Sequence, residues 1–260
     1  MRKPVIGIQM YSLRDEAERD FLGTLKKVTD IGYEAAELAG CFNMPAKRLR
    51  SEVQALGLII PSMIVSINFN TISKMASDLA RDLEYADELG VKWIVSPWIP
   101  VSEVPSMDEV NYLTEVLSRC GEQVRSAGMK YAIHNHESEF KVVDGTTMLD
   151  RLLEQVPADL LGLELDIGWA ALAGQDAGQY MHRYKERIAG VHMRDFESGR
   201  RDVELGKGKL DCDRLVGELC AAGIDNVYAE QEQFAEGSLE SAAANFAYLK
   251  KMVDHAYVEV

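Results

Sequence analysis

Cysteine is scarce in this sequence, and the cysteines that it has stand far apart. The 260 residues include four, Cys41, Cys120, Cys212 and Cys220, and no two of them form a CxxC pair. This pattern excludes a small fold held together by disulfide bonds. It is typical of small buried side chains in a reducing compartment.

Long apolar runs are missing as well. No apolar run reaches about 18 residues, the length that a membrane-spanning helix requires. The apolar stretch that follows Met1 ends before Ser12 and is too short for the apolar core of a signal peptide. We therefore expect a cytoplasmic protein that does not bind membranes.

Positive charge is in deficit. Lys and Arg number 28 against 42 Asp and Glu, which gives a formal net charge of −14. Because basic side chains that neutralise phosphates dominate affinity for nucleic acid, this balance makes nucleic acid an unfavourable partner. The expected partner is a small molecule, and a homo-oligomer stays open.

Several common catalytic and nucleotide-binding motifs are absent, and so are linkers. The sequence has no GxSxG elbow, no GxxxxGK[ST] loop and no dinucleotide fingerprint, which argues against serine-hydrolase, P-loop and Rossmann functions. It also has no Pro-rich or low-complexity segment. With an apolar fraction of 47%, we expect residues 1–260 to form a single domain.

What the sequence does contain is a repeat marked by glycine. An amphipathic segment, a glycine and a short apolar run follow one another again and again, as in LGLIIPSMIVSI and LGVKWIVSP. Glycine after a helix accepts the left-handed conformation without a steric penalty. The glycines are Gly32, Gly57, Gly90, Gly128, Gly162, Gly190 and Gly223, of which Gly162 and Gly190 open strands rather than follow helices.

The repeat predicts eight strands with helices between them. The strands fall near residues 5–10, 33–38, 58–67, 91–96, 129–134, 161–166, 189–193 and 226–231. Helical spacing of apolar residues is clear at 21–31, 71–89, 107–127 and 238–254. Apolar strands that alternate with helices favour an α/β fold, a single (β/α)8 TIM barrel, with a doubly wound open sheet as the alternative.

Each predicted strand ends in a polar residue, at the edge where such barrels carry their chemistry. Two imidazoles and two carboxylates would meet there and could bind Mn, Zn, Co, Mg or Fe in divalent form. A metal-free acid and base cluster is the alternative, although it would leave buried carboxylates repelling each other. The set consists of His134, Asp166, His192 and Glu230.

The fifth strand offers two candidate ligands. In His134-Asn135-His136 the alternation of a strand would place both imidazoles on one side. From the pattern alone, either histidine is a candidate for the fifth-strand ligand.

At this point the sequence resembles the xylose isomerase-like family of sugar isomerases and epimerases, which includes inosose dehydratases. The resemblance covers nearly the whole chain. The segments that carry it are GIQMYSLRDE, AIHNHESEF, LELDIGWAALAG, VHMRD, YAEQE and SLESAAANFAYLKKM. It implies a xylose isomerase-like barrel whose metal ligands correspond to His134, Asp166, His192 and Glu230.

Two positions depart from the family pattern. The usual fifth-strand ligand is a glutamate, whereas this chain has His134, as does a branch of the family with a His-Asn-His motif. The usual histidine three residues after the sixth-strand aspartate is replaced by Trp169, which could stack on a sugar ring.

The activity that the resemblance implies is a divalent-metal-dependent sugar isomerase or epimerase that acts on a ketose or related hydroxy-carbonyl sugar through an enediolate. Glu230 is the first candidate for proton transfer, and His136 or Glu139 would serve the opposite face. Arg194 would hold a hydroxyl or an anionic group, unless it forms a salt bridge with Asp195 or a loop carboxylate. Candidates for substrate binding are Gln9, Glu37, Trp169 and Glu137, and Glu137 is also a candidate for proton transfer.

Other functions stay open. The same residues would suit a metal-dependent dehydratase or lyase acting on a keto-inositol or a 3-keto-glycoside, and a non-catalytic sugar-binding barrel is the alternative that is not an enzyme. The loop at residues 205–209, with sequence LGKGK, could bind phosphate through its N–H groups and lysines, although a turn at the rim of the site is the favoured interpretation.

Overall fold

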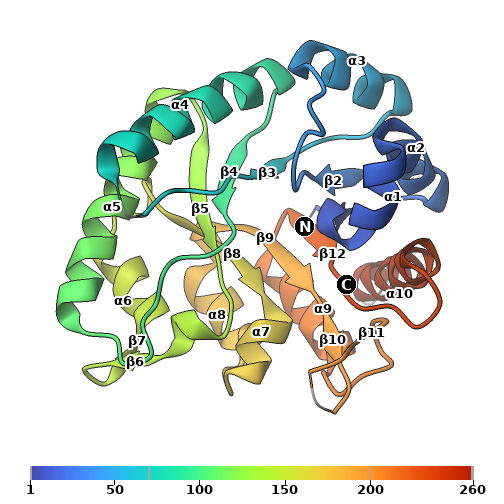
Figure 1. The fold of residues 1–260 in the computed structure, drawn as a ribbon. Coiled ribbons are helices and arrows are strands. Elements are labelled where there is room, and N and C mark those ends of the chain that lie inside the picture. Colours follow the sequence, from blue (N-terminus) through green and yellow to red (C-terminus); the bar gives the residue numbers. More distant parts are fainter. Residues whose placement is uncertain (1, 70, 199, 259–260) are drawn as a thin grey trace.

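Eight parallel strands form a ring with helices on its outside (Figure 1), in a computed structural model that describes residues 2–69, 71–198 and 200–258. The order around the ring is β2-β1-β12-β9-β8-β5-β4-β3. The strands are β1 (Val5–Gln9), β2 (Ala35–Glu37), β3 (Ser62–Ile64), β4 (Trp93–Ser96), β5 (Lys130–His134), β8 (Gly162–Asp166), β9 (Ile188–Met193) and β12 (Asn226–Ala229).

The two ends of this sheet meet and nearly close the barrel. Strands β2 and β3 are joined by an isolated parallel bridge between Leu38 and Met63, and the Ile64 N–H donates to the Leu38 carbonyl at 2.8 Å. An open doubly wound sheet would leave these edges apart. The predicted barrel is therefore confirmed, and the open-sheet alternative is wrong.

All eight predicted strand regions contain a strand. The third differs most in length from its predicted range. The predicted range 58–67 keeps only β3 as a strand. Pro61 lies directly before it and has no N–H to donate to a neighbouring strand. The Pro61 carbonyl still accepts hydrogen bonds from the N–H groups of Lys92 and Trp93, so this segment stays attached to the sheet.

Long helices cover the outside of the ring, and the four helical stretches that the sequence predicted are present. They correspond to α2 (Phe21–Ile31), α4 (Ile72–Leu89), α5 (Met107–Ser126) and α10 (Ser238–Val258). The remaining helices are α1 (Arg14–Arg19), α3 (Ala46–Leu56), α6 (Met148–Gln155), α7 (Ile167–Leu172), α8 (Ala177–Tyr184) and α9 (Cys212–Ala222), with short 3-10 turns η1 (Met10–Leu13), η2 (Ser138–Phe140) and η3 (Lys185–Arg187).

Two small hairpins lie at the edge of the barrel where the strands end. Strand β6 (Val142–Val143) pairs with β7 (Thr146–Thr147), and β10 (Asp195–Phe196) pairs with β11 (Asp202–Val203), both antiparallel. Each hairpin follows a barrel strand that carries a histidine, β5 or β9. The loops around the candidate site are thus partly built from ordered strands.

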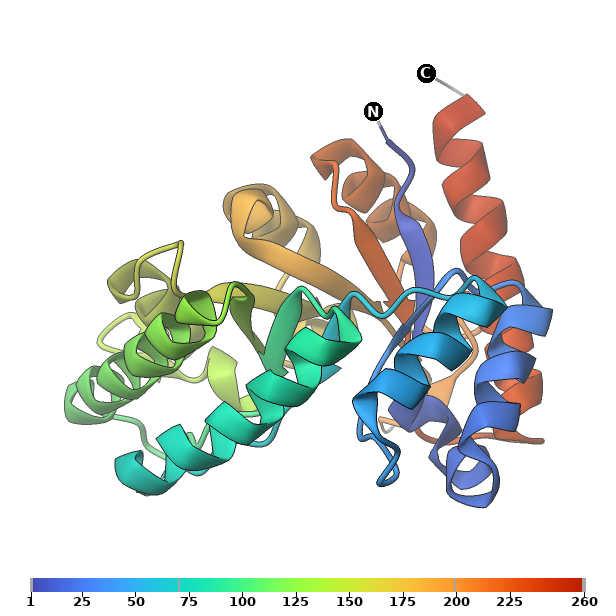
Figure 2. The ribbon, with the colours of Figure 1, turned by 90° about the horizontal axis from the view of Figure 1, so that it is seen from above.

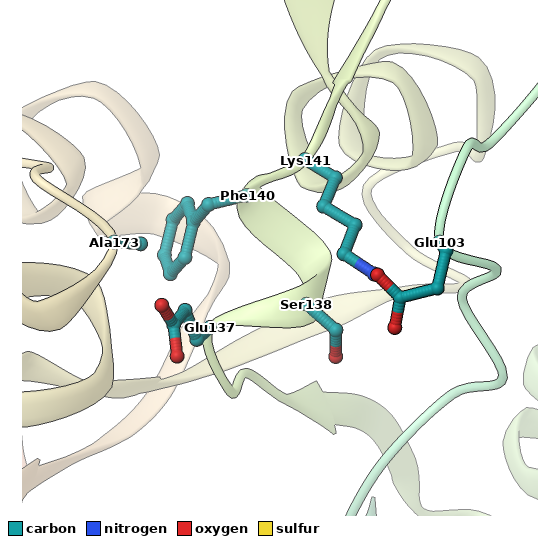
Figure 3. A pocket seen from close by; sticks show the side chains of 6 residues that line it. All are labelled: Glu103, Glu137, Ser138, Phe140, Lys141 and Ala173. Carbon is teal, nitrogen blue, oxygen red and sulfur yellow. The ribbon is translucent and has the colours of Figure 1, made fainter.

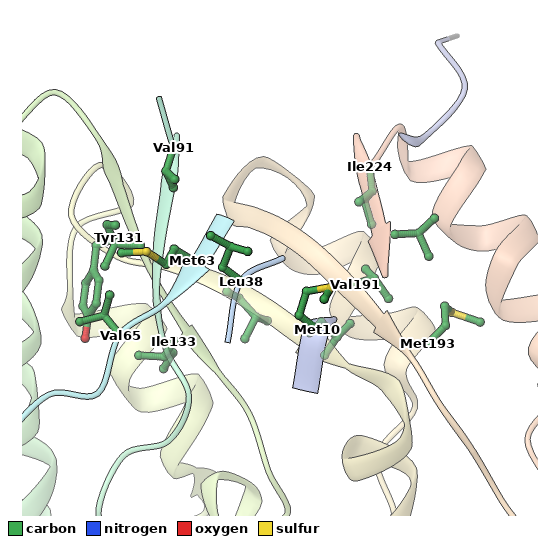
Figure 4. Close-up of a cluster of buried hydrophobic side chains, with 14 of the residues drawn as sticks. Met10, Leu38, Met63, Val65, Val91, Tyr131, Ile133, Val191, Met193 and Ile224 are labelled. Atoms are coloured by element: carbon green, nitrogen blue, oxygen red, sulfur yellow. The ribbon is translucent and has the colours of Figure 1, made fainter. Parts of the chain in front are cut away.

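The outer faces of the strands are apolar and pack beneath the helices. Figure 4 shows Ile133 of β5 together with Val191 and Met193 of β9 within this layer, and all three are buried. Because side chains alternate along a strand, the residues between them point into the barrel. This alternation sends His192, which stands between Val191 and Met193, inward.

A buried aromatic ring of β12 packs against glycines of the two neighbouring strands, β1 and β9. Tyr228 of β12 is fully buried, and a Cβ atom added to Gly7 or to Gly190 would lie 2.6 Å from its ring carbons. The two glycines therefore make room for the tyrosine. Its hydroxyl contacts the Ser62 hydroxyl at 3.0 Å, which begins a polar layer nearer the carboxyl ends of the strands.

The two ends of the chain lie on the same side of the molecule (Figure 2). The Lys3 ammonium contacts the Asp254 carboxylate of α10 at 3.0 Å. Within the described ranges, no helix is both long enough and apolar enough to cross a membrane.

Two glycines inside helices allow a matched test of this packing. A Cβ at Gly121 of α5 would lie 2.1 Å from the Leu160 carbonyl oxygen, whereas a Cβ at Gly217 of α9 would meet nothing within 4 Å. We expect Gly121→Ala to lower the free energy of unfolding by about 1–3 kcal/mol. Gly217→Ala should raise it by about 0.5–1 kcal/mol. Urea denaturation measures both, and equal effects would contradict this packing.

Candidate functional site

Four potential metal ligands meet at the carboxyl ends of the strands. His134 ends β5, Asp166 ends β8, His192 lies in β9, and Glu230 follows β12. One ligand atom from each lies within 4.8 Å of the others, and all four residues are buried. The structure thus brings together the set that the sequence pointed to, two imidazoles and two carboxylates, which could hold a divalent cation.

A second pair of carboxylates lies among these residues, deeper in the barrel. Glu37 of β2 and Glu164 of β8 have no exposed surface, and both lie next to His192. Sequence reasoning missed Glu164. Its signal was present, because Glu164 stands two residues before Asp166 in a strand and therefore points to the same inward face.

The ring of His192 is held at both nitrogens. Its Nδ1 lies 2.8 Å from Glu230 Oε2, and its Nε2 lies 2.8 Å from Glu37 Oε2 and 3.2 Å from Glu164 Oε2. Glu37 is itself fixed, since it accepts hydrogen bonds from Gln9 Nε2 at 2.6 Å and from the Ser62 hydroxyl at 2.5 Å. Gln9, predicted to bind substrate, uses its amide nitrogen for this contact.

The ring of His134 lies between a deep and a shallow carboxylate. Its Nδ1 is 3.3 Å from Glu164 Oε2, and its Nε2 is 3.9 Å from Asp166 Oδ2. Neither His134 Nδ1 nor either oxygen of Glu164 has a hydrogen-bond partner among the described residues. Buried polar atoms without partners are costly. Asp166 Oδ2, which belongs to the four clustered ligand groups, also lacks a hydrogen-bond partner among the described residues, which favours a site that is completed by a bound group.

Burial and neighbouring charges shift the pKa values of the histidines and of Asp166 in the site. Burial would lower the pKa of His192, but Glu164, Glu37 and Glu230 raise it well above its usual value. Burial, together with His192, lowers the pKa of His134. Burial raises the pKa of Asp166 to about 7 despite the nearby Arg194.

The carboxylates respond in opposite directions. Burial and the neighbouring Glu37 raise the pKa of Glu164 well above its usual value. Burial would also raise the pKa of Glu230, but Arg194 and His192 hold it well below its usual value. The site therefore offers an ionised Glu230 next to groups that retain protons.

Arg194 lies next to two of the four ligands, Asp166 and Glu230, and is paired with Asp202 and Glu232. Its Nη2 lies 3.0 Å from Asp202 Oδ2 and 2.9 Å from Glu232 Oε1, while its Nη1 lies 3.6 Å from Asp166 and 3.7 Å from Glu230. The alternative of a salt bridge to a loop carboxylate is thus present, with Glu232, and Asp202 of β11 is a second partner. A contact with substrate stays a prediction.

Asn135, another residue that sequence reasoning missed, positions Asp166. Its side-chain oxygen accepts from the Asp166 N–H at 3.0 Å, and its amide nitrogen donates to the Asp166 carbonyl at 3.1 Å. The Asn135 side chain thus makes the pair of hydrogen bonds that a strand backbone would make, and it continues the pairing of β5 with β8 by one residue. The asparagine between the two histidines therefore has a structural task.

A cleft of about 530 Å³ opens above these ligands. Its walls include His136 as well as Tyr11 and Trp98, which are 44% and 48% exposed at the rim. The predicted site residues that line it are Gln9, His134, His136, His192 and Glu230. Asp166 lies beneath them with no exposed surface.

The residues that line this cleft do not include Glu37, Asp166 and Arg194, nor three further predicted residues, Glu139, Trp169 and Glu137. Glu139 is buried, and its carboxylate accepts from the His136 N–H at 3.0 Å and the Ser138 hydroxyl at 2.9 Å. The Trp169 ring lies 5.3 Å from the His136 ring and also contacts Arg194. Glu137 is ion-paired with Arg200 at 2.6 Å.

Glu137 instead lines a separate surface pocket (Figure 3). Figure 3 shows it beside Phe140, with Lys141 extending towards Glu103. Lys141 Nζ and the Glu103 carboxylate are 3.2 Å apart, so the charges of this pocket are paired within the chain.

The loop at residues 205–209 is a turn built around Asp195. The Asp195 carboxylate accepts hydrogen bonds from the N–H groups of Gly206 at 3.0 Å, Gly208 at 2.8 Å and Leu210 at 3.0 Å. These are the donors that a phosphate would need. Asp195 occupies them in this structure, which supports the interpretation as a turn.

Comparison with known proteins places the barrel in a family. The profile of the xylose isomerase-like TIM barrel matches residues 25–252. The chain belongs to this family. Among its relatives, an inosose dehydratase of Geobacillus kaustophilus strain HTA426 is 27% identical over 197 residues, which cover 69% of this chain and 62% of the relative. The match thus spans less than two thirds of that protein.

Solved structures resemble the chain over almost its full length. A sugar phosphate isomerase/epimerase from Parabacteroides distasonis ATCC 8503 superposes with a TM-score of 0.85 at 22% identity, over 96% of this chain and 98% of the other. The IOLI protein with a binding zinc atom gives a TM-score of 0.81 at 16% identity, over 98% and 99% of the two chains. At such identities the likeness concerns the fold.

The shifted pKa values predict how cation binding depends on pH. A cation must displace protons from His192 and Asp166, and both pKa values are raised, so these protons persist to higher pH. The apparent affinity for Zn²⁺ should therefore rise as the pH increases through about 7, by about tenfold per pH unit for each displaced proton. Calorimetry in buffers of different ionisation enthalpy measures this release. A constant affinity without proton release would contradict the prediction.

Proposed function

We propose that this protein is a divalent-metal-dependent sugar isomerase or epimerase that acts on a ketose or a related hydroxy-carbonyl sugar. The observation that carries the proposal is the set of His134, Asp166, His192 and Glu230 at the floor of a cleft at the end of the barrel. Membership of the xylose isomerase-like family and the similarity to a sugar phosphate isomerase/epimerase support it.

A divalent cation fits the donor set. The neighbour with a bound zinc atom supports the same interpretation. The residues that would hold the ion are the four just named, and Arg194 would share in balancing the charge of Asp166 and Glu230. The chemistry that such an ion supplies is Lewis-acid stabilisation of negative charge on a carbonyl oxygen of the sugar.

Two groups of the cleft are suited to move the proton. Glu230 is held ionised by Arg194 and His192, so it is free to take a proton from the carbon next to the carbonyl, while the same positive charges lower its basicity. Burial lowers the pKa of His136, which keeps this imidazole neutral and able to accept or return a proton. The C–H bond breaks, its electron pair moves towards the carbonyl oxygen, and the proton goes to the base.

The fate of the enediolate decides the reaction class. Return of the proton to the neighbouring carbon gives an isomer, and return to the opposite face of the same carbon gives an epimer. Loss of a hydroxyl β to the carbonyl, with a proton supplied to it, gives water and an unsaturated product. The second candidate function is therefore a dehydratase, and the inosose dehydratase relative favours it.

Proton exchange in heavy water tests the proposal. Wild-type protein with added Mn²⁺ is incubated with ketoses, inososes and 3-keto-glycosides, and deuterium in the recovered sugar is measured by NMR. We expect metal-dependent exchange, which His136→Gln should lower by about 10²- to 10⁴-fold while metal content is retained. Glu230→Gln should abolish it.

A matched substitution controls for the loss of an imidazole. His182 is exposed on α8, so His182→Gln should leave the exchange rate unchanged. The isolated product then separates isomerase, epimerase and dehydratase. If no sugar in the panel exchanges although the protein binds metal, the enolising function is contradicted and a sugar-binding role takes its place.

A further inference from the structure

The deep carboxylates Glu37 and Glu164 lie behind the two candidate histidine ligands, on the side away from the cleft. Neither is among the residues that line the cleft, and neither has any exposed surface. We propose, resting on the proposed function, that they are positioning residues that fix which nitrogen of each histidine faces the metal. His192 would bind through Nδ1, and His134 would bind through Nε2.

The contacts of His192 assign its two nitrogens to different tasks. Nδ1 faces Glu230 at 2.8 Å, a spacing that two ligands of one ion at about 2.1 Å can have. Nε2 faces Glu37 at 2.8 Å. A neutral imidazole has one N–H, and placing it on Nε2 lets that N–H donate to Glu37 while Nδ1 keeps a free lone pair.

The contacts of His134 give the opposite assignment. Nε2 lies on the side of Asp166, and Nδ1 lies 3.3 Å from Glu164 Oε2. This pair falls short of hydrogen-bond geometry, yet both atoms are buried and neither has a hydrogen-bond partner among the described residues, although Glu164 Oε2 also lies 3.2 Å from His192 Nε2. With its proton on Nδ1, a small rotation of the ring would pair these two atoms and aim the Nε2 lone pair at the ligand set.

The geometry favours this role over a second cation held by Glu37, Glu164 and His192, which also form a compact group. Ser62 donates to Oε1 of Glu37, and the two lone pairs of Oε2 would be taken by Gln9 Nε2 and by the N–H at His192 Nε2. Histidine ligands of metals usually donate their other N–H to such a carboxylate, which raises the affinity for the metal by about 10- to 100-fold.

Nitrogen NMR of the zinc-loaded wild-type protein reads the two tautomers directly. Long-range ¹H–¹⁵N correlation spectra distinguish an imidazole N–H at Nδ1 from one at Nε2. We expect His134 to carry its proton on Nδ1 and His192 on Nε2. This measurement uses the wild-type protein without substrate, so it does not depend on whether a variant folds. The reverse assignment at either ring overturns the proposal.

Substitutions at Glu164 test the consequence for affinity. Glu164→Met removes the acceptor and should lower the Zn²⁺ affinity by about 10- to 100-fold, whereas Glu164→Gln keeps an oxygen acceptor and should lose less. Asp150→Asn is the matched control, because Asp150 is a buried carboxylate that binds Thr147 and Tyr184 away from the site. It should leave the affinity unchanged.

The outcomes separate this inference from the proposed function. Wild type that binds one Zn²⁺ with the expected tautomers, and loses affinity in Glu164→Met but not in Asp150→Asn, supports both. Wild type that binds two Zn²⁺ ions, or binds one with unchanged affinity in Glu164→Met, overturns the inference alone. Wild type that binds no divalent metal overturns the metal-dependent function and this inference with it.

Discussion

The barrel buries a cluster of negatively charged side chains, and the surrounding residues have to compensate for their charge. Glu37, Glu164, Asp166 and Glu230 lie almost without exposure around His134, His192 and Arg194. Isolated charges in such a place would cost several kcal/mol each. His192 and Arg194 offset part of this repulsion, and the raised pKa values of Glu164, Asp166 and His192 favour protons that stay within the cluster. A divalent cation that displaced these protons would take over their part in balancing the carboxylates.

The barrel tolerates this cluster because the surrounding backbone holds each charged group in place. Asn135 fixes Asp166 through both polar groups of its peptide backbone. Asp195 gathers three N–H groups of the following loop, and Asp202 and Glu232 hold Arg194 from behind. The outward-facing side chains of the strands are apolar and pack on the helices. The polar interior is therefore surrounded by an ordinary hydrophobic core.

The sequence predicted the strands and helices of the barrel more completely than the contacts of the candidate site. Strands and helices follow from apolar spacing and from glycines such as Gly57 and Gly90, whose φ angles are 70° and 89°. The four residues at the strand ends follow from the same spacing. The partners of a side chain do not, because they come from distant strands and loops. Glu139 and Glu137 thus point to loop partners, and Glu164 was missed although its period of two places it inside.

The position of the cleft has a consequence for the order of events at the site. The buried ring of Tyr228 packs on Gly7 and Gly190 of the neighbouring strands, beneath the polar layer. The candidate ligands are reached from the cleft at the carboxyl ends of the strands. If an ion and a sugar bind as proposed, they would share this entrance, so the ion would have to enter before the sugar.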